Sequence, residues 1–534
     1  MSRPKQIIGT IVAGLALMLT LSMWAFSSPV GASPDEDFHL ASAWCGNGER
    51  EGLCEAGHED ETRLVPDKAL EANCYAFQPQ TSAACQGKDF LDEGFSLIES
   101  DRVNSEGQYP SGFYFVSSLF TSDNIAVSTI AIRLAHSAIF TVLVMVTWWL
   151  LPRRLRFTMS ASVLLTLVPL GLFVIASPNP SSWAVLSTAV LFPALLGYFT
   201  TRGAQRVGLA VISAIAALIG FSSRGDSAAY AAVAIAAAMV LAFRPSKAYV
   251  LRAIVPAALI AAAGIAFLAA GQTGRALEGW TDDAPGSGGL MSIVNNFLAL
   301  PSLWTGALGM GWGLGWLDTG MPAILWAATL FCFVGVLFAA LRWQGWRKLI
   351  ALIGTGASVI VIPLYILYTG NAMVGENVQP RYLLPLLTLF LATALAPSIH
   401  GETVSENRPP HGPVRLNGMQ LWVIVALISG AQALAIYTNT KRYSGSGILA
   451  GKTAWWWDAG PTPLAVCVVG ALAFAVLAVL WAVDHTRDGV DAVAPNTPSP
   501  ATSVDAAPTS LVEEHATVED GIDTSTRPSQ PSQA

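Results

Sequence analysis

The sequence predicts an all-α polytopic membrane protein with about twelve transmembrane helices. Of its 534 residues, 53% are hydrophobic and only 12% are charged, and the mean hydropathy is +0.51. A soluble chain this apolar would lack the polar surface needed to face water. Apolar runs long enough to cross about 30 Å of hydrocarbon are expected at 7–26, 124–151, 157–176, 183–200, 207–221, 228–242, 254–270, 321–341, 349–368, 382–397, 421–437 and 463–483.

Basic residues predict the orientation of these helices, because cytoplasmic loops carry an excess of Lys and Arg. With Arg3 and Lys5 inside, every second loop is basic, which places both termini in the cytoplasm of a plasma-membrane protein. We expect the first span to be an uncleaved anchor, with a signal peptide cleaved near 30–32 as the alternative.

The same orientation predicts the domain organisation. The membrane domain is expected over 1–483, with large extracytoplasmic segments at 28–123 and 271–320. Residues 484–534 are rich in Pro, Ser, Thr, Ala and Asp and predict a disordered cytoplasmic tail.

Four cysteines lie in the first outside loop: Cys45, Cys54, Cys74 and Cys85. Such a cluster on the outer face predicts two disulfides. Zinc is the alternative, but the loop has no CxxC or HxxxH spacing to favour it. Three pairings are possible, and the sequence does not choose among them.

The start of this loop holds the first candidate catalytic residues. Asp35, Glu36 and His39 follow the first apolar run almost directly. Asp35 and His39 would lie one turn apart on a shared helix face, and a carboxylate beside an imidazole suits a general base for a hydroxyl group. Helix capping is the simpler alternative, because Ser33 suits the N-cap and Glu36 would complete a capping box.

Two arginines later in the chain are expected at the same extracytoplasmic boundary of the membrane. Arg381, followed by Tyr382, precedes a late span, and its guanidinium offers paired donors to a phosphate. An interfacial anchor paired with Glu376 is the alternative. Arg224 and Asp226 lie in a short loop between two spans, where ionisable residues are either functional or paired with each other.

Tryptophan marks two further outside segments. Trp456 is the middle of three consecutive Trp residues, which either form a membrane belt or stack on sugar rings or prenyl units. The Gly/Trp-rich segment 271–320 predicts an interfacial or re-entrant element lining a lipid-tail groove, with a plain aromatic belt as the alternative.

Three motifs together resemble an uncharacterised family of predicted membrane proteins from actinobacteria, which is similar in design to GT-C glycosyltransferases. The resemblance covers about 7–483 and rests on Pro34-Asp35-Glu36 with His39, on Ser223-Arg224-Gly225-Asp226, and on Val378-Gln379-Pro380-Arg381-Tyr382-Leu383-Leu384-Pro385.

That resemblance implies transfer of a sugar from a polyprenyl-phosphate donor to an envelope glycan or lipid acceptor on the outer face. Asp35 matches the acid expected to act as the base. We expect Glu36 or His39 to orient the acceptor and Arg381 with Arg224 to hold the phosphate. The His-Pro-Pro-Leu-Tyr-Tyr element that GT-C enzymes often carry is degraded at 108–114, which lacks the His and the second Pro.

Other functions stay open at this level. A lipid-linked glycan transporter or flippase, or a non-catalytic envelope-assembly protein, would use the same scaffold. The sequence demands no metal, although Asp35, Glu36 and Asp226 would suit Mg²⁺ or Mn²⁺ if they converge. The chain has no P-loop or dinucleotide fingerprint, and nothing in it predicts nucleic-acid binding.

Overall fold

The protein is a bundle of apolar helices, as predicted. The computed structural model describes residues 3–70, 74–87, 94–271, 289–376, 378–397, 399, 414, 416–445, 447–448 and 455–491. Within these residues, eleven helical segments are long and apolar enough to cross a membrane. They are α1 (Arg3–Phe26), α6 (Ile125–Leu150), α7 (Arg153–Thr166) continuing through η2 (Leu167–Gly171) into α8 (Leu172–Ile175), α9 (Ser181–Thr200), α10 (Gly203–Phe221), α11 (Gly225–Ala242), α12 (Lys247–Ala269), α15 (Ala323–Ala340), α16 (Trp346–Thr369), α18 (Gly418–Ser444) and α19 (Pro463–Asp491).

The twelfth predicted span is the shorter helix α17 (Pro380–Leu395). It packs against α7, α9, α14 (Leu290–Ala307) and α16, and nearly all of its residues are buried. A helix enclosed by other helices does not have to match the thickness of the lipid around the bundle, so sixteen residues suffice. By contrast, α12 is mostly exposed, and Leu251 and Ile265 on its surface suit contact with lipid.

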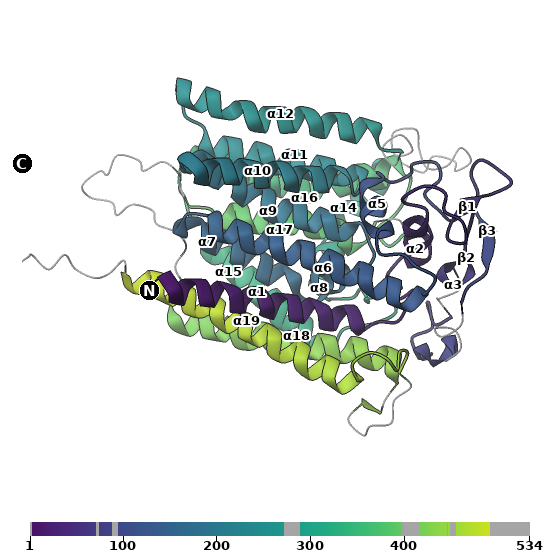
Figure 1. Cartoon of the computed structure of the whole chain (residues 1–534). Helices are drawn as coiled ribbons and strands as arrows, with labels where there is room; N and C mark the ends of the chain where they lie inside the picture. The colour runs from purple at the N-terminus through teal and green to yellow at the C-terminus, as the bar shows by residue number, and fades with distance from the viewer. Residues whose placement is uncertain are drawn as a thin grey trace, which may run out of the picture. The chain divides into compact units, whose positions relative to one another are not determined.

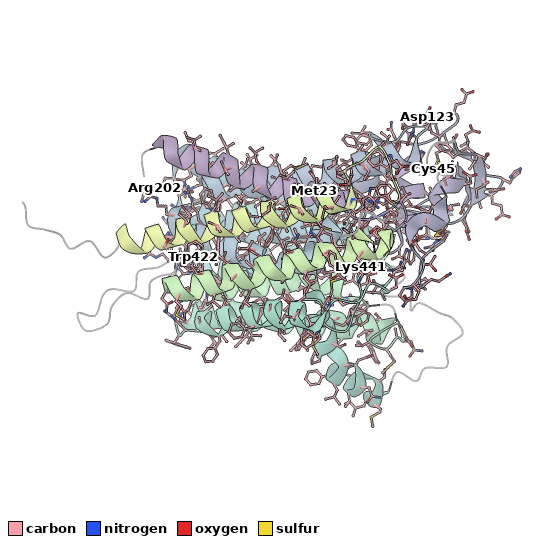
Figure 2. All side chains as sticks on the ribbon, turned by 90° about the horizontal axis from the view of Figure 1, so that it is seen from below. Met23, Cys45, Asp123, Arg202, Trp422 and Lys441 are labelled. Atoms are coloured by element: carbon pink, nitrogen blue, oxygen red, sulfur yellow. A yellow bond between two sulfur atoms is a disulfide. The ribbon has the colours of Figure 1, made fainter. Side chains whose placement is uncertain are left out.

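A compact extramembrane segment follows α1 and lies at one end of the helices (Figure 1). Its elements are α2 (Glu36–Trp44), β1 (Glu55–Ala56), β2 (Arg63–Pro66), α3 (Asp67–Leu70), η1 (Ala83–Gln86), β3 (Leu97–Ser100) and α5 (Gly112–Ser118). The strands form an antiparallel sheet in the order β1-β2-β3, with Leu64 opposite Glu99. Cys45, Asp123 and Lys441 lie at this end of the bundle, and Arg202 lies at the other (Figure 2).

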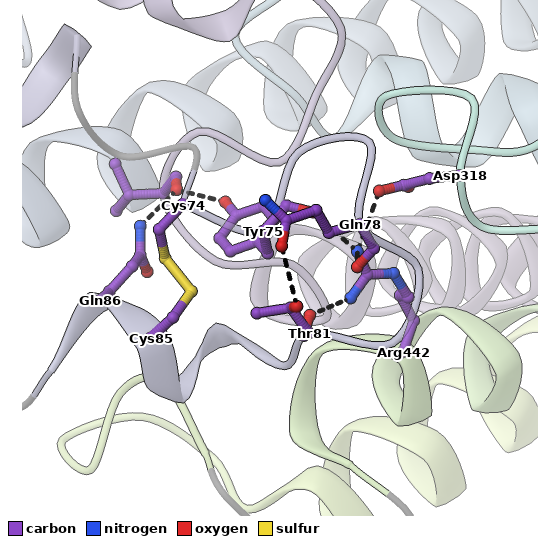
Figure 3. Close-up of a disulfide and its surroundings, with 9 residues drawn as sticks. Cys74, Tyr75, Gln78, Thr81, Cys85, Gln86, Asp318 and Arg442 are labelled. Atoms are coloured by element: carbon purple, nitrogen blue, oxygen red, sulfur yellow. Dashed lines mark hydrogen bonds and ion pairs between the residues drawn. A yellow bond between two sulfur atoms is a disulfide. The ribbon is translucent and has the colours of Figure 1, made fainter.

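The two predicted disulfides are confirmed, and they join Cys45 to Cys54 and Cys74 to Cys85. Beside the second disulfide, Arg442 of α18 donates to the backbone carbonyl oxygens of Tyr75, Gln78 and Thr81 (Figure 3). Its Nη2 also lies 2.9 Å from Asp318 Oδ2. This buried cation therefore ties the disulfide loop to a late transmembrane helix.

Two predicted segments differ in detail from the structure. Residues 272–288 lie outside the described part, but the rest of 271–320 forms α14 and a tight turn in which Leu314 pairs with Thr319. Helix α19 continues to Asp491, eight residues beyond the expected end at 483, because its apolar core adds stability to the polar turns that follow. The predicted tail beyond residue 491 lies outside the described residues.

Candidate active site

The site begins where the chain leaves α1 and turns into α2. Asp35 is the N-cap of α2 and has the left-handed backbone conformation, with φ 57°. The Nδ2 of Asn179, just before α9, donates to the carbonyl oxygen of Pro34 at 3.0 Å and fixes this turn to the bundle. The predicted N-cap at Ser33 is therefore wrong by two residues.

One half of the predicted capping box is nevertheless present. The backbone N–H of Ser33 donates to Glu36 Oε2 at 2.6 Å, whereas the Ser33 hydroxyl is buried without a hydrogen-bond partner. Glu36 faces the bundle because its other oxygen lies 2.8 Å from Arg133 Nη2 in α6. Both side chains are essentially fully buried, and Arg133 also donates to the carbonyl oxygens of Ala25, Ser28 and Pro29. Glu36 thus fixes the turn and does not face a substrate.

Asp35 and Arg381 come together as an ion pair, with 2.6 Å between Oδ2 and Nη2. The Arg381 side chain is 3% exposed, whereas that of Asp35 is 41% exposed and accessible from outside the bundle. Arg102 lies farther out, 4.0 Å from Asp35 Oδ1, and pairs mainly with Asp37. Burial by itself would raise the pKa of Asp35, but Arg381 and the other nearby charges outweigh burial and lower it.

Arg381 retains hydrogen-bonding capacity that the protein does not use. Its Nη2 donates to Asp35 and to the Tyr382 hydroxyl, but Nε and Nη1 are buried without a partner. Among the described arginines, this Nη1 is the only buried terminal nitrogen without a partner. Leaving a buried donor unsatisfied costs about 1–3 kcal/mol, so an incoming anion would stabilise this arginine.

Tyr382 connects Arg381 to the second predicted arginine. The guanidinium carbon of Arg224 lies 4.2 Å from the centre of the Tyr382 ring, and that of Arg381 lies 5.0 Å from it. Arg224 also forms a two-pronged ion pair with Asp226, both contacts at 2.8 Å. The predicted structural pairing of Arg224 with Asp226 is therefore present, and it holds a cation beside Arg381.

His39 lies one helical turn after Asp35 and is buried among tyrosines. Its Nδ1 is 2.9 Å from the hydroxyl of Tyr114, and its ring meets that of Tyr109 edge-on. Burial lowers the pKa of His39 to about 3, and the nearby arginines act in the same direction. His39 is therefore a neutral hydrogen-bonding group at pH 7.

A small apolar cavity adjoins Arg381. It is lined by Pro34, by residues 170–174 of the broken helix, by the turn after α14, and by 379–381. The cavity measures about 20 Å³, which is room for roughly one water molecule, so it does not itself hold a lipid chain. The predicted lipid-tail groove along the Gly/Trp-rich segment stays a prediction.

Two predicted site residues lie in other surroundings. Glu376 accepts a hydrogen bond from the backbone N–H of Met373 and does not pair with Arg381. Trp456 is buried, and its indole N–H donates to the carbonyl oxygen of Phe26 at 3.3 Å. The tryptophan run therefore packs against the end of α1.

The acids considered for a metal do not converge. Asp35, Glu36 and Asp226 are each paired with a different arginine. In the described part of the chain, no group of three His, Cys, Asp or Glu residues is placed to hold a metal ion. This donor set does not fit Mg²⁺ or Mn²⁺.

Sequence reasoning missed three neighbours that contribute to the site, namely Arg102, Tyr109 and Tyr114. Arg133, for which the sequence favours a pair with another helix, supports the site from behind by pairing with Glu36 of α2. The degraded motif at 108–114 contains both tyrosines and was the available signal for them. Arg133 is an ionisable residue within an apolar run, which by itself indicates a buried partner.

Comparison with known proteins gives one match. The sequence profile of a family described as predicted membrane protein (DUF2142) matches residues 18–390, well over half of the chain. That region contains Asp35, Arg224 and Arg381. No curated protein and no solved structure matches the chain significantly.

Proposed function

Because the chain belongs to the DUF2142 family of predicted membrane proteins, we propose that its polar cluster at the membrane boundary is the active site of a glycosyltransferase. The donor is a sugar linked to polyprenyl phosphate, and the acceptor is an envelope glycan or lipid. The reaction takes place on the extracytoplasmic face, and its design is that of GT-C enzymes.

The observation that carries this proposal is the Asp35–Arg381 pair. Arg381 is buried and has two unpartnered nitrogens, and it adjoins an apolar cavity. A guanidinium binds phosphate through paired N–H groups. The partly exposed carboxylate of Asp35 lies beside this position, where an acceptor hydroxyl can approach.

The chemistry follows from this arrangement. The acceptor oxygen attacks the anomeric carbon and forms the new glycosidic bond, and its proton passes to Asp35. The bond between the anomeric carbon and the phosphate oxygen breaks, and its electron pair leaves with the phosphate. Arg381 and Arg224 stabilise the phosphate charge as it develops, which is usually the largest catalytic contribution. The sugar configuration inverts in this single displacement.

Donor binding should also change the basicity of Asp35. In the free protein, Arg381 holds the pKa of Asp35 low, which keeps the carboxylate ionised but makes it a weak base. A phosphate placed on Arg381 offsets that positive charge and brings a like charge close to Asp35, and both effects raise its pKa. The carboxylate therefore becomes a stronger base when the donor is bound.

Label transfer by the purified protein tests the proposal. The donors are a mixed pool of radiolabelled polyprenyl-phosphate sugars, and the acceptors are envelope extracts. Asp35→Asn should abolish transfer, whereas Asp123→Asn, an exposed acid outside the cluster, should retain it. Equal transfer by wild type and a folded Asp35→Asn variant would remove Asp35 from the mechanism. If neither transfers label but the protein moves the labelled lipid across vesicle membranes, the transporter alternative replaces the enzyme.

A further inference from the structure

A polar cavity of about 530 Å³ lies in the extramembrane segment, apart from the Asp35–Arg381 pair. Its lining includes Ser42, Glu49, Arg63, Asn104, Ser111 and Tyr114. Small-molecule sites measure roughly 300–1,000 Å³, so this cavity has the size of a ligand site. None of its lining residues belongs to a membrane-spanning helix, so its ligand would come from the aqueous phase.

The walls of this cavity are held in place by covalent and hydrogen bonds. The Cys45–Cys54 disulfide forms one side. On another side, the Asn104 side chain donates to the carbonyl oxygen of Tyr109 at 2.9 Å and accepts from its N–H at 2.8 Å. The backbone N–H of Asn104 in turn donates to Ser42 Oγ at 2.9 Å. A preformed cavity loses little conformational entropy when a ligand binds.

The cavity lies one side-chain layer away from the proposed reaction site. Tyr114 lines it, and the Tyr114 hydroxyl is hydrogen-bonded to His39, which is one turn from Asp35. A molecule in this cavity would therefore not touch the reacting atoms. It could be the remote part of an extended acceptor whose near end reaches Asp35.

The lining favours a neutral ligand with many hydroxyl groups. Glu49 and Arg63 are the only carboxylate and the only guanidinium in the lining, so its charges balance. The Ser111 hydroxyl makes no capping bond and can both donate and accept, whereas the Ser42 and Ser105 hydroxyls donate to backbone carbonyl oxygens and keep only acceptor capacity. Resting on the proposed function, we infer that the cavity binds a neutral sugar unit of the acceptor glycan, remote from the unit that reacts.

Direct binding tests this inference without requiring transfer. The full-length protein in nanodiscs is applied to an array of neutral and anionic oligosaccharides, and the strongest neutral oligosaccharide is then titrated. Ser111→Trp should fill the cavity and weaken that binding by at least about tenfold. Ser111 is exposed and its side chain makes no capping bond in α5, so this change should be tolerated. Ser96→Trp, an exposed position outside the lining, is the matched control.

The possible results separate this inference from the proposed function. The cavity would be supported as the glycan site if wild type, Ser96→Trp and Asp35→Asn bind neutral glycans and Ser111→Trp does not. This holds even if no transfer is found. Three results would overturn the inference: binding that Ser111→Trp leaves unchanged, a preference for anionic glycans, or no binding to the array. Each would do so whatever the transfer assay shows.

Discussion

Arg381 Nη2 and Asp35 Oδ2 lie 2.6 Å apart although 346 positions separate the two residues in the sequence. The pair joins the N-terminus of α17 to the turn that precedes α2. It differs from the Glu36–Arg133 pair one residue later, in which both side chains are buried. One pair is open to a ligand on the carboxylate side, whereas the other supports the turn.

Replacing Arg381 with Lys should separate charge from geometry. Lysine keeps the positive charge but loses the paired donors that match phosphate oxygens. We expect sugar transfer to fall by roughly 10²–10³-fold, as for the loss of a donor to a developing anion. The measurement is the initial rate of transfer at saturating acceptor.

The matched control for that change is Arg342→Lys, at an exposed arginine whose Nε donates to the Ala339 carbonyl oxygen. It should transfer label at the wild-type rate. Equal rates for Arg381→Lys and Arg342→Lys would mean that Arg381 contributes only charge.

Removing the charge of Glu36 should destabilise the folded protein. This prediction concerns stability and not sugar transfer. Glu36→Gln leaves the buried Arg133 without a charged partner, and breaking a buried ion pair costs about 3–5 kcal/mol. The measurement is the apparent melting temperature in detergent. Asp123→Asn, at an exposed position, should leave it almost unchanged.

A double variant makes this prediction sharper. Glu36→Leu with Arg133→Met removes both charges, so it should recover much of the stability that Glu36→Gln loses. A double variant no more stable than Glu36→Gln would show that Arg133 matters chiefly through the carbonyl oxygens of Ala25, Ser28 and Pro29.

The buried imidazole of His39 should make the fold sensitive to acid. Its pKa is about 3 in the folded protein and near 6.5 when exposed, so the unfolded state binds the extra proton. The stability that this difference contributes is complete above pH 6.5 and is lost as the pH falls from 6.5 toward 3. Between pH 7 and pH 4.5 the loss would be on the order of 2–3 kcal/mol.

His39→Gln keeps a neutral hydrogen-bonding group but binds no proton. Its apparent melting temperature should therefore fall less than that of wild type between pH 7 and pH 4.5. Asp35 does not confuse this comparison, because its pKa is lowered below 3.8 and its contribution is lost at more acidic pH. Parallel curves for wild type and variant would show that His39 is not the group responsible.

The positions of the helices could be predicted from the sequence, whereas the contacts between distant residues could not, and the reasons are physical. Hydrophobicity is a property of a continuous segment, so all twelve apolar runs could be located, including α17. Asp35, Arg224 and Arg381 could be identified separately, since charges at a membrane boundary are costly. Their partners could not, because residues such as Glu36 and Arg133, 97 positions apart, meet only in the folded bundle.

The membrane orientation predicted from basic residues can be tested by cysteine labelling. Asp123 and Arg202 are exposed and lie at opposite ends of the bundle (Figure 2). In intact cells, a membrane-impermeant maleimide should label Asp123→Cys at once and Arg202→Cys only after permeabilisation. The native thiols of Cys332 and Cys467 are buried and should give little background. The reverse labelling pattern would place Asp35 and Arg381 on the cytoplasmic side, where an extracytoplasmic polyprenyl-phosphate donor could not reach them, and the proposed reaction would have to be abandoned.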